Sequence, residues 1–228
     1  MKSAKRSGRT LGVLLLVHLI TGLMVPYMLL QQLSRPRTLA ETSLANPFQV
    51  RLAVMMLFVG GALTLVIAIT GMPVFRESSR AMALWLFGLA IVNFALQGGE
   101  IAGYMSVFTF SQNYVNANAA DLSVYELVGV TVRSAWKWIH YTHLLIMVGW
   151  IFSLGLMLWK SAVVPRILAA LLLITSLMQI TGITLPQFLA YPSPNLMLMG
   201  VPLAFAYLGL SVWLMIKGFR TPVEEATS

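Results

Sequence analysis

The chain has 228 residues, of which 58% are hydrophobic and only 10% are charged, and its mean hydropathy is +0.82. Globular domains carry about 25% charged residues, so this chain has too few charges to cover a soluble surface. The composition excludes a soluble globular protein, a disordered chain and a nucleic-acid-binding module. Cysteine is absent, which excludes disulfide bonds and Cys-ligated metals. We therefore expect an all-α, polytopic membrane protein.

Six apolar segments are long enough to cross a bilayer, which requires about 20 apolar residues per helix. They predict a single domain over residues 1–228, folded as a bundle of six transmembrane helices. In chain order, the predicted spans cover residues 11–30, 48–72, 81–105, 135–159, 166–186 and 196–216. The first span follows a basic segment and resembles a signal peptide, but no small-residue cleavage site closes it. We interpret it as an uncleaved signal anchor.

The connections between these spans are mostly short. Residues 35–46 form a polar loop, residues 73–80 a charged turn, and residues 161–165 and 191–195 two further turns. The longest connection, residues 106–133, is expected to be a long outer loop, and its stretch 122–132 has the pattern of a short surface helix. Since the loops are short, consecutive helices should be neighbours in the bundle.

The net charge of +8 comes from Lys and Arg residues that lie near the ends of the spans. One side of the membrane receives ten of the fifteen: Lys2, Lys5, Arg6, Arg9, Arg76, Arg80, Lys160, Arg166, Lys217 and Arg220. The other side receives five: Arg35, Arg37, Arg51, Arg133 and Lys137. Positive residues favour the cytoplasmic side, so we expect both termini inside and residues 106–133 outside.

Polar residues recur at helical spacing within three of the spans. In the third span, Asn93, Gln97, Glu100 and Tyr104 follow steps of four, three and four, which places them within about 60° of arc. The fourth span repeats this spacing with Trp136, His140, His143 and Met147, and the fifth repeats it with Thr175, Gln179, Gly182 and Pro186. His18 lies in the first span. Ionisable groups inside a membrane are costly and usually face the interior of a bundle.

The helical rise places several of these groups at a common depth. His140 and His143 lie about 7 to 13 Å below the outer end of their span, and Glu100 and Gln179 lie within about 10 Å of theirs. The sequence therefore predicts a polar, ligand-binding pocket in the outer half of the bilayer. Its candidate residues are Glu100, Tyr104, His140, His143, Gln179, Asn93, Gln97 and Trp136.

Two plainer interpretations stay open beside this one. Polar stripes in membrane helices often only form interhelical hydrogen bonds, worth about 0.6 kcal/mol each, and Asn93, Gln97 and Gln179 fit that role. His140 and His143 also fit a position near the lipid headgroups. Glu100 is harder to explain structurally, because a buried carboxylate needs a partner or a proton.

We expect no metal and no cofactor, although the residues are compatible with two such sites. Glu100, His140 and His143 could share a zinc ion, and two histidines could hold a haem. The chain has neither a metalloprotease HExxH motif nor a GxSxG motif, and its one aspartate, Asp121, lies outside the spans. The sequence therefore favours a protein that is not an enzyme and has no catalytic residues.

Several short motifs in the second half of the chain resemble a known family. Residues 111–115, Ser-Gln-Asn-Tyr-Val, resemble an S-Q-x-Y-V element, and residues 164–168 resemble an I-P-R-x-L turn. Arg133, Trp138 and His140 match the start of the family's fourth span, and residues 201–204 and 212–219 its last span. The family is the domain-of-unknown-function family 4386 of bacterial multi-pass membrane proteins.

This resemblance implies six spans and a bacterial cytoplasmic membrane, but no activity. It also implies one departure. The family often has an arginine and a glutamate three residues apart in its third span, where this chain has Ala90 and Asn93. Glu100 follows two turns later on the same face. His140 keeps its place in the family pattern, which raises its rank as a site residue.

Three functional hypotheses follow. The first is binding or transport of a small amphipathic or lipid-like molecule through the outer-half pocket. The second is a non-catalytic partner subunit or sensor that contacts another membrane protein through residues 106–133. The third, weaker hypothesis is an intramembrane haem or metal protein. The expected partners are the lipid bilayer, a small amphipathic ligand and a membrane partner protein, with no nucleic acid.

Overall fold

The computed structural model describes residues 2–34, 38–119, 121–191 and 198–220. These residues form helices and no strands. The long helices are α1 (Lys2–Met24), α4 (Pro47–Ser78), α5 (Arg80–Val115), α6 (Leu122–Ser161), α7 (Arg166–Phe188) and α8 (Val201–Lys217). Between α1 and α4 lie the π-helix η1 (Val25–Leu29) and the short helices α2 (Gln31–Ser34) and α3 (Leu39–Ser43).

Six of these segments are long and apolar enough to cross a membrane, so the expected multi-pass helical bundle is confirmed. The helices α1 and α4 to α7 are longer than the predicted spans because their ends continue beyond the apolar stretch, whereas α8 (17 residues) is shorter than the span predicted for it. The start of the predicted sixth span, residues 196 and 197, lies outside the described residues. The predicted turn 191–195 lies almost entirely outside them, as does most of the tail.

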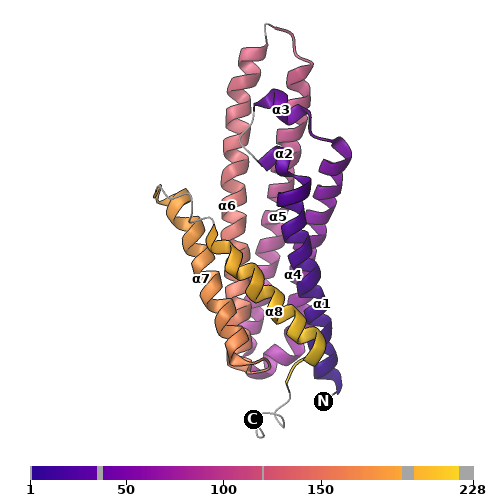
Figure 1. Ribbon diagram of the computed structural model, residues 1–228, viewed down its shortest axis with the longest axis vertical. Coiled ribbons are helices and arrows are strands. Elements are labelled where there is room, and N and C mark those ends of the chain that lie inside the picture. Colours follow the sequence, from indigo (N-terminus) through magenta and orange to yellow (C-terminus); the bar gives the residue numbers. More distant parts are fainter. Residues whose placement is uncertain (1, 35–37, 120, 192–197, 221–228) are drawn as a thin grey trace.

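The helices pack in chain order as a ring: α1 on α4, α4 on α5, α5 on α6, α6 on α7 and α7 on α8. The ring closes because α8 packs back on α1. The start of α1 and the end of α8 therefore lie at the same end of the molecule, and α8 runs obliquely across the bundle (Figure 1). The main apolar core lies between the helices around Trp150 and Phe75, which are both fully buried.

Residues 106–133 differ most from the sequence expectation. Instead of a long loop, α5 continues to Val115 and α6 starts at Leu122, so the two helices project together beyond the rest of the bundle (Figure 1). No proline or glycine interrupts 106–115, and helix α3 packs against α5 there. The Gln112 side chain donates to the backbone oxygen of Ser43 at 2.6 Å, and Arg133 donates to the Thr42 hydroxyl at 2.5 Å. Tertiary contacts thus stabilise helix in residues 106–115, where the polar sequence indicates a loop, and the helix expected at 122–132 is the first part of α6.

The expected turn at residues 73–80 is also shorter than the sequence suggests. Pro73 lies inside α4, which continues to Ser78, and only Ser79 separates α4 from α5. Membrane helices tolerate an internal proline because their surroundings compensate for the missing backbone hydrogen bond. Ser79 then caps α5 by accepting a hydrogen bond from the Met82 backbone N–H at 3.4 Å.

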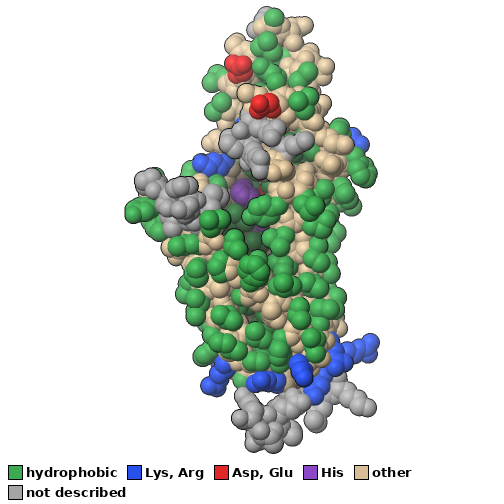
Figure 2. All heavy atoms as spheres, in the orientation of Figure 1, with side chains coloured by type: hydrophobic (Ala, Val, Ile, Leu, Met, Phe, Trp, Pro, Cys, Tyr) green, Lys and Arg blue, Asp and Glu red, His purple; other side chains and the backbone are tan. Residues whose placement is uncertain are grey.

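Apolar side chains cover the length of the bundle, whereas Lys and Arg side chains gather at the end where the chain starts (Figure 2). Large exposed residues such as Trp85, Phe58 and Phe205 belong to this apolar belt. Exposed aromatic and aliphatic side chains are stable in contact with lipid, so the surface fits a bilayer environment.

Candidate functional site

The polar stripe of α5 faces the interior of the bundle. Asn93, Gln97, Glu100 and Tyr104 are between 1% and 6% exposed. The 3.6-residue period of the helix puts all four on one face, and the cost of polar groups in lipid turns that face inward. Each of these side chains therefore needs a partner inside the protein.

Glu100 finds its main partners on α6. Its Oε1 lies 2.6 Å from Nδ1 of His140, and its Oε2 lies 2.5 Å from Nδ1 of His143. The Gln97 side-chain amide donates to the same Oε2 at 3.2 Å. Four of the candidate residues thus form one cluster, which we call the Glu100 cluster: Gln97, Glu100, His140 and His143.

The chemistry of the carboxylate determines the state of the imidazoles. An ionised carboxylate only accepts hydrogen bonds, so His140, which hydrogen-bonds to it, carries a hydrogen on Nδ1. In a neutral imidazole, Nε2 is then a hydrogen-bond acceptor, and in a protonated imidazole it is a donor. Glu100 therefore orients the His140 ring through Oε1, and its Oε2 lies beside the His143 ring.

Two aromatic rings extend the cluster along α5 and α6. The rings of Tyr104 and Trp136 lie 5.0 Å apart, and Trp136 stacks on His140 at 5.7 Å with an interplanar angle of 26°. Trp136 and His140 stack because they are four residues apart on α6. Stacking on one face and the carboxylate at Nδ1 together hold the His140 ring in one orientation.

His140 also lines a cavity of about 500 Å³ between α1, η1, α6, α7 and α8. Most of the wall is apolar, with side chains such as Leu19, Leu144 and Ile183. The wall also carries polar side chains and tyrosine hydroxyls: His18, Tyr27, His140, Tyr141, Gln179, Gln187 and Tyr207. Figure 2 shows a hollow on this face of the molecule, with a histidine side chain visible inside it. The cavity opens on the apolar belt of the bundle, where Tyr27 and Phe205 on its rim are 72% and 70% exposed.

Gln179 lies on the cavity wall, as does Gly200. A Cβ added at Gly200 would lie 3.4 Å from Cδ of Gln179. Asn93, in contrast, lies away from the cavity and donates to the Thr64 hydroxyl of α4 at 3.4 Å. Asn93 therefore links α4 to α5, which is the structural role that the sequence left open for it.

Sequence reasoning placed His18 in the first span but left it out of the candidate list, and it did not single out Tyr207. The structure brings them together on the cavity wall, where Nδ1 of His18 lies 3.0 Å from the Tyr207 hydroxyl. His18 also meets the edge of the Trp150 ring at 5.9 Å. The lone histidine in an apolar helix was a usable signal, whereas a tyrosine 189 residues away along the chain had none.

Among the described residues, no group of three or more His, Cys, Asp or Glu side chains is arranged to hold a metal ion. The zinc hypothesis therefore gains no support from the described residues.

The fold and this buried site define a class: a multi-pass helical membrane protein with a polar cluster beside a cavity open to the apolar belt. The particular family follows from a sequence comparison. Residues 10–218 match the model of a domain of unknown function, DUF4386, and the chain belongs to this family. No curated protein and no solved structure matches the chain.

Proposed function

We propose that this protein binds a small amphipathic or lipid-like molecule in the cavity between α1, α6, α7 and α8, as a step in its storage or transport. The observation that carries the proposal is the contrast within the cavity. Apolar walls suit a hydrocarbon chain, and an oriented imidazole, His140, suits one polar group. Ligand sites commonly combine a mostly apolar lining with a few fixed polar groups.

The exposed apolar rim supports entry from the bilayer rather than from water. A molecule that slides between Tyr27 and Phe205 keeps its hydrocarbon part in an apolar environment throughout. Its polar head leaves its contacts with the lipid headgroups and forms hydrogen bonds with Nε2 of His140 and the side-chain amide of Gln179. A hydroxyl or a protonated acid can donate to a neutral His140, and an anionic head can accept from a protonated one.

The distribution of Lys and Arg residues also favours a particular membrane and orientation. The protein lies in a bacterial cytoplasmic membrane with both termini inside, because ten of its fifteen Lys and Arg residues belong to that side. The Glu100 cluster and the cavity then lie in the outer half of the bilayer.

A cavity-filling substitution tests the proposal. Gly22 lies on the cavity wall, and a Cβ added there meets no atom within 4 Å, so Gly22→Phe fills the cavity without a backbone clash. Gly209 on α8 also has open space around it but does not line the cavity, so Gly209→Phe is the matched control. The probe is a long-chain fatty acid that carries a photoreactive diazirine, added to membranes that contain each variant.

We expect the probe to crosslink to the wild type and to Gly209→Phe. Crosslinking to Gly22→Phe should fall about tenfold, which corresponds to a loss of about 1.4 kcal/mol in binding free energy. The labelled peptides should come from α1, α6, α7 or α8. Equal labelling of the two variants would show that the probe reacts only with the lipid-facing surface, and the proposal would fail.

A second candidate function is supported by the projecting ends of α5 and α6. Val124, Leu127 and Val130 recur every three residues on α6 beyond the bundle, and all three are exposed. An apolar stripe outside the apolar belt fits contact with another membrane protein. A photoreactive amino acid at Leu127 should then capture a defined partner in intact membranes, whereas the same residue at Glu126, one position away, should capture little.

A further inference from the structure

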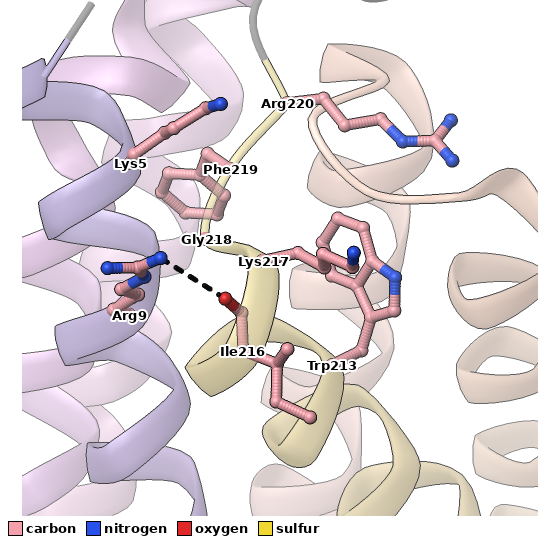
Figure 3. Close-up of a pocket in the computed structure, with 8 residues that line it drawn as sticks. All are labelled: Lys5, Arg9, Trp213, Ile216, Lys217, Gly218, Phe219 and Arg220. Carbon is pink, nitrogen blue, oxygen red and sulfur yellow. Dashed lines mark hydrogen bonds between the residues drawn. The ribbon is translucent and has the colours of Figure 1, made fainter. Parts of the chain in front are cut away.

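A second cavity, of about 540 Å³, lies at the end of the molecule where the chain starts. Four cationic side chains line it: Lys5 and Arg9 come from α1, and Lys217 and Arg220 come from the end of α8 and the residues after it (Figure 3). The other lining residues are Trp213, Ile216, Gly218 and Phe219. None of the described lining residues is acidic. We call this site the basic pocket.

Close backbone packing brings these distant residues together. A Cβ added at Gly8 would collide with the backbone of Phe219, and one added at Gly218 would collide with the carbonyl of Lys5. Gly218 also has a φ of +72°, a conformation that favours glycine. Phe219 is fully buried and packs against Phe75, so the chain after α8 is anchored beside α1. The basic pocket is therefore a built feature of the fold and not only a basic run in the sequence.

Arg9 and Arg220 both contact uncharged groups. The Arg9 guanidinium donates to the backbone oxygen of Ile216 at 3.3 Å (Figure 3). The Arg220 guanidinium lies 5.8 Å from the centre of the Trp213 ring. A carbonyl group and an aromatic face orient a guanidinium but leave its charge in place. Positive charge thus accumulates around one cavity, and a bound anion would offset the repulsion.

The surroundings indicate where such an anion comes from. On α8, exposed Val212, Met215 and Ile216 form an apolar flank that leads from the belt of the bundle to the basic pocket. Tryptophan, here Trp213, is typical of the interface between hydrocarbon and headgroups. An anionic lipid can place its acyl chains on this flank and its phosphate among the four cations, which a soluble anion cannot do.

We propose that the basic pocket binds the headgroup phosphate of an anionic phospholipid from the leaflet at this end of the molecule. This site is separate from the cavity of the proposed function, with which it shares no lining residue. The anionic lipid holds the start of α1 against the end of α8, at the junction that closes the helical ring.

The test is a titration of the purified full-length protein with phosphatidylglycerol, followed by native mass spectrometry, with phosphatidylcholine as the neutral lipid. The pocket variant is Arg9→Gln with Arg220→Gln. The matched control is Arg80→Gln with Arg166→Gln, which removes the same charge at the same end of the bundle. Arg166 lies 6.0 Å from the Trp159 ring, so the control also loses a similar cation–π contact.

We expect the pocket variant to bind phosphatidylglycerol at least about tenfold more weakly, because Arg9 and Arg220 both line the pocket. We expect the control to keep the wild-type affinity, because neither Arg80 nor Arg166 lines it. Equal losses in the two variants would mean general charge attraction and would overturn the proposal. Displacement of phosphatidylglycerol by an equal concentration of inorganic phosphate would also overturn it, because the occupant would then be a soluble anion. Should the double variant not fold, Lys217→Gln replaces it, because this side chain is exposed and its loss should still weaken binding several-fold.

Discussion

His140 and His143 contact the same carboxylate from one face of α6, but the side chain of His143 is 5% exposed and that of His140 is 24% exposed. A buried polar group that loses its partner leaves the other group unsatisfied, at a cost of about 1–3 kcal/mol. The two residues should therefore differ in function: His143 mainly stabilises the buried carboxylate, and His140 presents Nε2 to the cavity.

The first prediction separates these roles by substitution. His143→Ala should lower the free energy of unfolding by about 2–4 kcal/mol, because it leaves Glu100 buried without one of its partners. His140→Ala should lower it by less than half as much, but should abolish crosslinking to the diazirine fatty acid. Unfolding in detergent, followed by circular dichroism, measures the first effect. A larger loss of stability from His140→Ala would contradict the assignment.

The second prediction concerns Glu100 itself. Glu100→Gln removes the acceptor charge, and an amide cannot accept from both imidazoles and Gln97 as a carboxylate does. We expect a loss of about 2–4 kcal/mol in stability. Glu126→Gln is the control, because Glu126 is exposed and accepts a hydrogen bond from the Tyr114 hydroxyl at 3.3 Å. The midpoints of thermal unfolding of the two variants compare the effects, and equal midpoints would mean that the Glu100 cluster adds nothing to stability.

At the scale of the helices, Gly61 is a point of close approach between α4 and α5. A Cβ added at Gly61 of α4 would lie 3.0 Å from Cγ of Gln97 and 3.1 Å from the Phe94 ring. Gly61 therefore allows α4 and α5 to pack closely beside the buried polar stripe. This packing places Gln97 where it can donate to Glu100.

The third prediction tests this approach. Gly61→Leu should push α5 away from α4 and lower stability by about 1–3 kcal/mol, the usual cost of overpacking. Gly88→Leu on α5 should change stability little, because a Cβ there meets no atom within 4 Å. Fluorescence-detected size-exclusion chromatography after heating reports the fraction of each variant that stays folded. Equal fractions would show that the α4–α5 contact adapts to a larger side chain.

At the scale of the whole molecule, the closed ring of helices puts the start of α1 and the end of α8 at one end and the projecting part of α5 and α6 at the other. The chain has no cysteine, so a single introduced cysteine reports the side of the membrane without a background. Both Asn118 and Glu77 are exposed: Glu77 lies in the last turn of α4, just before α5 begins, and Asn118 lies just after α5 ends.

The fourth prediction therefore concerns orientation. In cells whose inner membrane is intact, a membrane-impermeant maleimide should label Asn118→Cys and should label Glu77→Cys only after lysis. This result follows from the excess of Lys and Arg at the end that carries Glu77. The reverse labelling pattern would show that the protein has the opposite orientation, with the cavity in the inner half of the bilayer.

The sequence alone determined the features that depend on the local cost of placing groups in lipid. Apolar length predicted the six crossings, and the spacing of Asn93, Gln97, Glu100 and Tyr104 predicted an inward-facing stripe. Both predictions rest on one helix at a time, since a helix in a bilayer satisfies its own backbone and turns its polar face inward.

Only the tertiary structure determined which side chains of other helices these polar faces contact. The contact between Glu100 and His140 depends on the rotation and the relative shift of α5 and α6, and a single helix pattern contains neither. The pair His18 and Tyr207 and the basic pocket both depend on α8 returning to α1, which closes the ring between opposite ends of the chain. The helical extension to Val115 depends in the same way on contacts with α3. Packing between distant segments carries this information, because each contact is a property of two surfaces and not of either sequence by itself.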